Sequence, residues 1–406
     1  MAVGLSAEID PDSVAGVRLG SAPLGVRSDP RDDLTVIELA AGSRVAAVFT
    51  RNAFCAAPVI VAREHLDRQA PRYLLINAGN ANAGTGSQGL ADARRCCQAV
   101  AERTGCSADQ VLPFSTGVIG VSLPVARFPE AIDVALAELV EDGWVAAARA
   151  IMTTDTVPKA VSRRFDVEGH TVTVTGIVKG AGMMRPDMAT MLAFVATDAT
   201  VAHALLDDSL QRAMQQSFNR ITVDGDTSTN DACVLVATGV GSAPCIDDPS
   251  SDGAHALHRA VSEICTWLAQ AIVRDAEGAT KFITIAVHEG RDEQECLQLA
   301  YAVAHSPLVM TAMYASDANW GRILAVVGRA GLEDLDIGAV RIHLGDVCIV
   351  ADGERAADYS EERGQAAMSA DEIRVDIGLG RGDAQATVWT SDLSREYVTI
   401  NAEYRT

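Results

Sequence analysis

A bent loop that runs directly into an apolar strand is the feature that most constrains this fold. Two glycines and a proline fall within residues 180–186, and residues 191–196 form a continuous apolar run. Glycine and proline permit a sharp, strained turn, and a short apolar run after such a turn is typical of a buried strand. Thr190 lies at the junction, directly after the small residue Ala189. We therefore expect a threonine hydroxyl where a loop enters the core.

A hydroxyl at this junction allows a specific chemistry. Attack of the Thr190 hydroxyl on the carbonyl of Ala189 would form an ester, whose hydrolysis leaves Thr190 with a free N-terminal amine. That amine can then act as the base for its own hydroxyl, which is the N-terminal-threonine form of nucleophile activation. The simpler interpretation is a loop that enters a core strand, where β-branched residues are common. The residues alone leave both interpretations open.

Composition disfavours several classes of function. The 406 residues carry a formal net charge of −21, from 33 Lys and Arg against 54 Asp and Glu, and such a surface repels nucleic acid and anionic membranes. No signal peptide is visible in the first thirty residues, and no window reaches the ~20 apolar residues of a membrane span. Nine cysteines and eight histidines show no metal-ligand spacing, so we expect reduced thiols, a cytoplasmic protein and no metal site.

Strand-like and helical patterns alternate along the chain without a regular βαβ order. Segments 163–167 and 171–178 flank a Glu-Gly-His turn, which predicts an antiparallel hairpin aimed at the loop. Segment 254–275 carries one apolar face at helical spacing. Further strands are predicted at 34–39, 45–50, 73–77, 191–196, 282–288, 338–351, 372–378, 386–390 and 396–401, and further helices at 90–103, 124–150 and 202–219. The pattern predicts an α+β fold, with two or three units by length.

Two other segments carry candidate chemistry. Acyl transfer needs donors aimed at a carbonyl oxygen as it becomes an oxyanion, and a glycine-flanked turn offers accessible backbone N–H groups. Thr116 and Gly117, in the Ser/Thr/Gly turn at residues 114–120, are such candidates, although an ordinary turn has the same composition. Asp275 and Glu277 follow the long helix and oppose its dipole, and an unfavourable local choice of this kind hints at function.

Taken together, these segments resemble the ornithine acetyltransferase family, also called glutamate N-acetyltransferases. The resemblance is carried by Lys179, the glycine pair, Pro186 and the Met-Ala-Thr-Met-Leu core at 188–192, and matching segments run from near residue 15 to the last residue. It implies that Thr190 is the nucleophile and that Thr116 and Gly117 form the oxyanion hole. It also implies a set of substrate-binding residues, which are Thr153, Lys179, Thr190, Glu277, Asn401 and Thr406.

The resemblance also implies an architecture and an assembly. The expected fold is a layered α-β-β-α sandwich of the ornithine acetyltransferase and aminopeptidase group, with a C-terminal α/β part. Cleavage between Ala189 and Thr190 would give an α chain, residues 1–189, and a β chain, residues 190–406, in an α2β2 heterotetramer.

The reaction implied by the resemblance transfers the acetyl group of N-acetyl-L-ornithine to L-glutamate through an ester on Thr190. It needs no metal or organic cofactor, and the use of acetyl-CoA as a second donor stays open. The nearest alternative is an autoprocessed aminopeptidase or amidase, which passes the acyl group to water. A phosphate- or cation-binding enzyme built on the loops at 77–86 and 224–231 is a further alternative, although we interpret both loops as turns that pack around the site. A self-cleaving amino-acid-binding module is the last.

Overall fold

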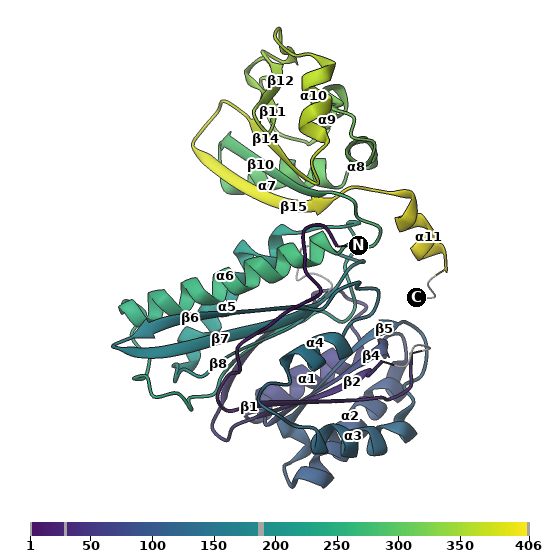
Figure 1. The fold of residues 1–406 in the computed structure, drawn as a ribbon, viewed down its shortest axis with the longest axis vertical. Helices are drawn as coiled ribbons and strands as arrows, with labels where there is room; N and C mark the ends of the chain where they lie inside the picture. Colours follow the sequence, from purple (N-terminus) through teal and green to yellow (C-terminus); the bar gives the residue numbers. More distant parts are fainter. Residues whose placement is uncertain (1, 28–30, 186–190, 404–406) are drawn as a thin grey trace.

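The computed structural model describes residues 2–27, 31–185 and 191–403. Two stacked sheets with helices outside them form the larger body, and a third sheet forms a C-terminal unit at one end of it (Figure 1). The long helix α6 lies on the side of the body nearest to that unit.

The first sheet of the body has the strand order β1-β2-β4-β5. Its pairs are antiparallel except for the parallel pair β4 and β5. The strands are β1 (Val17–Ala22), β2 (Leu34–Leu39), β4 (Tyr73–Asn80) and β5 (Val111–Val118). An apolar layer joins its outer face to α2 (Gly86–Thr104) and α3 (Phe128–Ala137). The same region contains α1 (Ala57–Arg68), α4 (Trp144–Ala150) and the short 3-10 helices η1 (Ala108–Gln110) and η2 (Val125–Arg127).

The second sheet has the order β3-β9-β8-β7-β6 and stacks on the first. Its strands are β3 (Arg44–Phe49), β6 (Lys159–Val167), β7 (His170–Lys179), β8 (Leu192–Thr197) and β9 (Ala232–Ala237). Phe114 of β5 meets Phe194 of β8 edge to face, with ring centroids 5.1 Å apart. The expected hairpin is present, because β6 and β7 pair antiparallel across the positive-φ residues Glu168 and Gly169.

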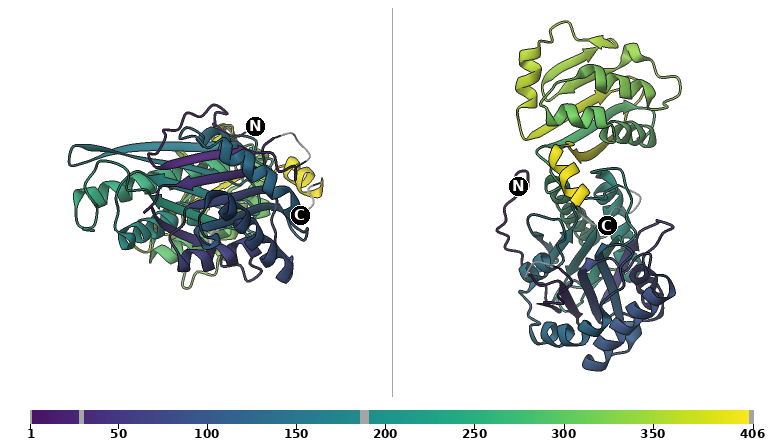
Figure 2. Two further views of the ribbon diagram at one scale, coloured as in Figure 1. Left: turned by 90° about the horizontal axis from the view of Figure 1, so that it is seen from below. Right: turned by 90° about the vertical axis from the view of Figure 1, so that its right-hand side faces the viewer.

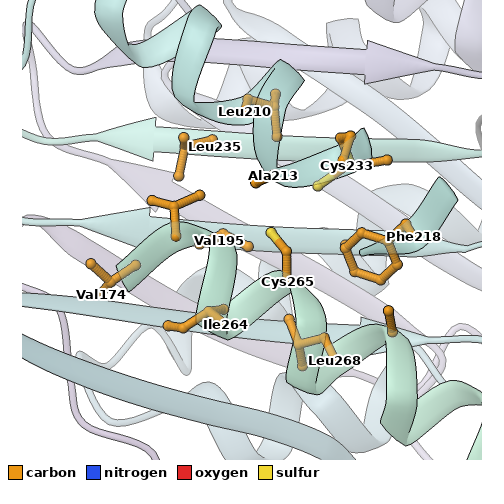
Figure 3. Close-up of a cluster of buried hydrophobic side chains, with 14 of the residues drawn as sticks. Val174, Val195, Leu210, Ala213, Phe218, Cys233, Leu235, Ile264, Cys265 and Leu268 are labelled. Carbon is orange, nitrogen blue, oxygen red and sulfur yellow. The ribbon is translucent and has the colours of Figure 1, made fainter. Parts of the chain in front are cut away.

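The outer face of the second sheet is covered by α5 (His203–Gln216) and α6 (Asp252–Arg274). The apolar face predicted for 254–275 is the buried one, which Figure 3 shows packed on Val195 and Val174. The free thiols of Cys233 and Cys265 lie in the same cluster. Helices, two sheets and helices thus follow one another in layers, and the predicted α-β-β-α sandwich is confirmed. The 3-10 helix η3 (Phe218–Arg220) follows α5.

The C-terminal unit is built on a sheet of order β13-β12-β11-β14-β10-β15 with its own apolar core. Its strands are β10 (Phe282–Gly290), β11 (Arg341–Leu344), β12 (Val347–Ala351), β13 (Glu354–Arg355), β14 (Glu372–Gly378) and β15 (Ala384–Ser391). Its helices are α7 (Glu293–Ala304), α8 (Pro307–Tyr314), α9 (Trp320–Arg329), α10 (Glu361–Met368) and the 3-10 helix η4 (Ile337–Ala339).

The strand predicted at 396–401 is wrong. These residues belong to helix α11 (Arg395–Glu403), which descends from the C-terminal unit toward the body (Figure 2). The β-branched residues there favoured a strand, but the segment pairs with no described strand. Ser394 caps the first turn instead, since its Oγ accepts a hydrogen bond from the N–H of Tyr397 at 3.3 Å.

In the described ranges no single helix is long and apolar enough to cross a membrane. Helices α7 and α8 have the length and composition of a membrane span only when they are taken together, and the chain bends by 61° between them.

Candidate active site

Segments far apart in the sequence converge on one pocket where the stacked sheets meet α11. Its lining residues are Ala81, Thr116, Gly117, Ile119, Thr153, Thr154, Lys179, Gly182, Met183, Ser228, Thr229, Asn230, Glu277 and Asn401. Every oxyanion or substrate residue expected from the sequence, where the structure describes it, is in this lining. The chain brings them together from both sheets, the end of α6 and α11.

Thr116 and Gly117 lie near the end of strand β5, not in the free turn that the sequence predicted. β5 continues to Val118 because it keeps pairing with β4, with an irregular register around Gly79. Gly117 has a φ of +131°, and a Cβ on it would lie 2.3 Å from the carbonyl carbon of Gly79. Only glycine fits such a position, so strand backbone itself forms this wall of the pocket.

Lys179 brings a buried cation into the pocket. The residue ends strand β7 and is 5% exposed, and its Nζ donates a hydrogen bond to Thr116 Oγ1 at 3.2 Å. Burial lowers the pKa of Lys179, while the carboxylates of Asp155, Glu277 and Asp231 oppose that shift. A lysine held in this way can bind the carboxylate of a small ligand.

A buried ion network lies beside Lys179, and sequence reasoning missed it. Lys159 Nζ lies 2.7 Å from Asp155 Oδ1 and 2.7 Å from Asp275 Oδ2. Burial alone would raise the pKa of Asp155, but the positive charges of Lys159 and Lys179 hold it well below its usual range. The sequence offered two weak signals: the Asp155 and Lys159 spacing around a proline, and an acidic residue at the end of α6.

Glu277 forms the opposite charge in the pocket lining. Its backbone N–H donates to the carbonyl oxygen of Ala181 at 2.9 Å, and its Oε2 accepts a hydrogen bond from Asn401 Nδ2 at 2.7 Å. Two residues proposed to bind substrate, from the end of α6 and from α11, are therefore in direct contact. An amino acid has charges of both signs, which Lys179 and Glu277 can each match.

Helix α11 is fastened to the segment before the predicted cleavage site. Tyr397 Oη lies 3.3 Å from Asp224 Oδ2, and the Asp224 carboxylate accepts hydrogen bonds from the N–H groups of Met183 and Met184 at 2.6 and 2.8 Å. Burial raises the pKa of Asp224. Ser394 Oγ adds a hydrogen bond to the carbonyl oxygen of Gly278 at 2.6 Å. These contacts position Asn401 at the pocket.

The comparison with known proteins gives the family of the chain. Residues 18–406 match the model of the ArgJ family. The chain belongs to the ArgJ family. It is 55% identical over 406 residues, the full length of both chains, to the arginine biosynthesis bifunctional protein ArgJ of Pseudomonas syringae pv. tomato. It is 59% identical over 393 residues to the protein of that name from Methylococcus capsulatus, covering 97% of this chain and 96% of the relative.

A solved structure gives a second comparison. The crystal structure of arginine biosynthesis bifunctional protein ArgJ from Bacillus halodurans is 37% identical to the chain, with a TM-score of 0.50. The match covers 52% of this chain and 98% of the solved chain. The family expected from the sequence is therefore confirmed.

Two loops for which the sequence left other functions open pack around the pocket. They are the glycine-rich loop, residues 77–86, and the acidic loop, residues 224–231. In the acidic loop, Asn230 Nδ2 donates to the carbonyl oxygens of Ala81 and Ser115 at 2.7 and 2.9 Å, which ties it to the glycine-rich loop and to β5. Asp231 Oδ1 accepts the N–H of Met191 at 2.9 Å, and burial raises the pKa of this carboxyl. Both loops therefore pack around the site as expected, and Ala81, Ser228, Thr229 and Asn230 also line the pocket, so contact of these loops with a ligand stays open.

Three residues expected at the site, Ala189, Thr190 and Thr406, lie outside the described residues, as do Pro186 and Met188. Across the described parts of the chain, no group of three or more His, Cys, Asp or Glu side chains is arranged to hold a metal ion.

Proposed function

We propose that this ArgJ-family chain is a self-processing acetyltransferase of arginine biosynthesis, which moves the acetyl group of N-acetyl-L-ornithine to L-glutamate. One observation carries the proposal: the pocket joins a buried cation, Lys179, and a carboxylate, Glu277, to the strand-end pair Thr116 and Gly117. Lys179 and Glu277 match the negative and positive charges of an amino acid. Thr116 and Gly117 can hold the carbonyl oxygen of the acyl group. The relatives named arginine biosynthesis bifunctional protein support this assignment.

The first half-reaction forms an acetyl ester on Thr190. The Thr190 hydroxyl attacks the acetyl carbonyl while its own α-amine takes the hydroxyl proton. Thr116 and Gly117 stabilise the oxyanion, the C–N bond breaks, and the proton passes to the departing amine of ornithine. Lys179, Glu277, Thr153 and Asn401, which line the pocket, hold the amino-acid part of the donor, and we propose the same role for Thr406.

The second half-reaction uses the same pocket. The uncharged α-amine of glutamate attacks the ester carbonyl, a C–N bond forms and the C–O bond to Thr190 breaks. The proton that the attacking amine loses passes to the Thr190 oxygen as N-acetylglutamate leaves. The chemistry needs neither a metal nor an organic cofactor. The word bifunctional in the relatives' names supports a second activity, for which we propose acetyl-CoA as the alternative donor to glutamate.

Processing at Ala189-Thr190 precedes this chemistry and yields chains of 189 and 217 residues. In support, the solved Bacillus halodurans chain is matched over 98% of its own length but over only 52% of this chain. A single processing product would cover about that share of the full chain. The products would stay together, because β7 and β8 on either side of the cleavage site are paired neighbours in one sheet. We propose an α2β2 assembly in the cytoplasm, with which nine free thiols accord.

The deciding experiment measures acetyl transfer from N-acetylornithine to glutamate in the presence of a metal chelator, with acetyl-CoA as donor in a parallel reaction. We expect N-acetylglutamate to form from N-acetylornithine, and Thr190→Ala to form none. Release of acetate at a rate independent of glutamate would instead identify an amidase. An absolute requirement for added metal would also contradict the proposal.

A further inference from the structure

A fully buried lysine lies behind the pocket and takes no part in the steps above. Lys159 donates to Asp155 Oδ1 and Asp275 Oδ2 at 2.7 Å each and to the carbonyl oxygen of Val157 at 3.3 Å. The Lys159 side chain is 0% exposed. All three of its N–H donors are occupied, so its charge serves the two carboxylates and not a ligand.

Asp155 reaches from this lysine to the pocket wall. Its Oδ2 accepts the N–H of Thr153 at 2.9 Å, and its Oδ1 accepts the N–H of Gly180 at 2.8 Å. Thr153 lines the pocket, and Gly180 directly follows Lys179. One carboxylate thus fixes two backbone segments that each carry a pocket residue.

Asp275 holds the far side of the network. It accepts the N–H of Thr156 at 2.9 Å and the Thr156 hydroxyl, and it lies two residues before Glu277. Like Asp155 it is buried and bonded to Lys159. The two carboxylates therefore have similar surroundings and differ in which part of the pocket they approach.

Their contacts with the segment that carries Lys179 distinguish the two carboxylates, because Asp155 accepts a hydrogen bond from the N–H of Gly180. Burial disfavours the positive charge of Lys179 most. Among the carboxylates, Asp155 favours this charge most strongly and is followed by Glu277 and Asp231, whereas the positive charge of Lys159 opposes it. Asp275 instead accepts the backbone N–H groups of Thr156 and Val157, at 2.9 and 3.3 Å. Neutralising Asp155 would therefore remove a favourable charge near Lys179 and weaken the bonds to Thr153 and Gly180, whereas Asp275→Asn leaves both of these bonds in place.

We propose that Asp155 is a positioning residue that aligns Thr153 with Lys179 for the carboxylate of the amino-acid substrate. Lys159 and Asp275 hold Asp155 in place for this purpose. The inference rests on the proposed function, because it needs Lys179 to meet a substrate carboxylate.

The test compares pH profiles of kcat/KM for Asp155→Asn and Asp275→Asn. Lys179 binds a carboxylate only while protonated. With Asp155 neutral, burial is less opposed and Lys179 loses its proton at lower pH. We expect the alkaline limb of the Asp155→Asn profile to move down by about one pH unit. At pH values above the limbs of both wild type and variant, this shift lowers kcat/KM of the variant about tenfold relative to the wild type. Asp275→Asn removes a carboxylate from the same lysine, so its thermal stability should fall comparably while its limb stays near that of the wild type.

Lys179→Arg identifies the limb, because a guanidinium does not deprotonate in this range, and the part of the alkaline limb that belongs to Lys179 should disappear. Titration of the substrate amine is common to all variants and cancels in the comparison. If Asp155→Asn does not fold, Asp155→Ser, which leaves room for water, replaces it. Equal shifts in the two Asn variants, or no shift in the Asp155 variant, would overturn the proposal in favour of a structural role.

The two proposals can fail separately. A wild type that transfers no acetyl group would overturn the proposed function. The pH dependence of N-acetylornithine binding, measured by calorimetry on the same variants, would then decide the role of Asp155. Absence of binding, or binding with the same alkaline limb in wild type and Asp155→Asn, would overturn it.

Discussion

Gly182 and Glu277 share a space that admits only one side chain. A Cβ on Gly182 would lie 2.5 Å from Glu277 Oε2 and 2.6 Å from its Cδ, closer than such atoms approach in proteins. The backbone bond from Glu277 to Ala181 keeps the two segments together, so neither can simply withdraw. The carboxylate of Glu277, which is proposed to bind substrate, can therefore occupy its position only because residue 182 is a glycine.

Gly182→Ala should impair binding without unfolding the protein. The clashing atoms belong to the end of a flexible side chain, so Glu277 can swing away at little cost in stability, and it then leaves its bond to Asn401. We expect KM for N-acetylornithine to rise about tenfold, equivalent to ~1.4 kcal/mol of binding free energy, with a melting temperature close to that of the wild type. Steady-state kinetics and calorimetry measure both quantities.

The matched control is Gly328→Ala in helix α9, where a Cβ would meet no atom within 4 Å. This variant should keep wild-type kinetics and gain a little stability, since alanine favours helix. Unchanged KM in Gly182→Ala would show that Glu277 does not bind the substrate in its present position.

Processing should divide the chain at one bond. Denaturing electrophoresis and intact mass should give pieces of 189 and 217 residues, the second beginning with Thr190. Under native conditions they should elute together because β7 and β8 remain paired. Thr190→Ala should stay a single inactive chain, while Thr190→Ser retains a hydroxyl and should still divide. Cleavage of the Ala variant at the same bond would assign the nucleophile to another residue.

Acid should destabilise the protein partly through His305. This ring accepts or donates a hydrogen bond with Thr222 Oγ1 at 2.9 Å, and burial, with the charge of Arg185, lowers its pKa to about 4. The unfolded chain binds a proton on this histidine near pH 6.5. Its contribution to stability is therefore complete above pH 6.5 and is lost as the pH falls toward 4.

His305→Gln removes this titration and should flatten the loss of stability between pH 7 and pH 4.5. Urea unfolding of wild type and variant across that range measures the difference. At pH 7.5 the two should differ only by the changed hydrogen bond to Thr222. If the two stability curves run parallel down to pH 4.5, His305 takes up its proton as readily in the folded protein as in the unfolded chain.

The sequence predicted those features that depend on local pattern. The apolar face of α6 and the hairpin of β6 and β7 each follow from a pattern that lies within a short stretch of the sequence. The ion network could not be predicted in this way, because Lys159 and Asp275 are 116 residues apart and only the fold brings them into contact. Helix α11 was missed for a related reason: whether β-branched residues such as Val398 form a strand depends on a partner strand, and the described chain provides none.

The pocket wall contributed by α11 gives the last prediction. Asn401 lies in the pocket lining and contacts Glu277, while Tyr397 on the same helix holds Asp224. A chain ending at residue 400 keeps Tyr397 and loses both Asn401 and Thr406. It should fold and still cleave at the Ala189-Thr190 bond, because cleavage needs Thr190, its loop and oxyanion donors, but acetyl transfer should fall at least tenfold.

Two further chains divide this effect between the two residues. A chain ending at residue 403 removes Thr406 and keeps Asn401, whereas Asn401→Ala does the opposite. Val398→Ala is the control on the same helix, since that side chain is 62% exposed, and it should transfer acetyl groups at the wild-type rate. If the chain ending at residue 400 cleaves and turns over N-acetylornithine like the full chain, α11 takes no part in substrate binding, and the grip on the amino acid must come from Lys179 and Glu277 without it.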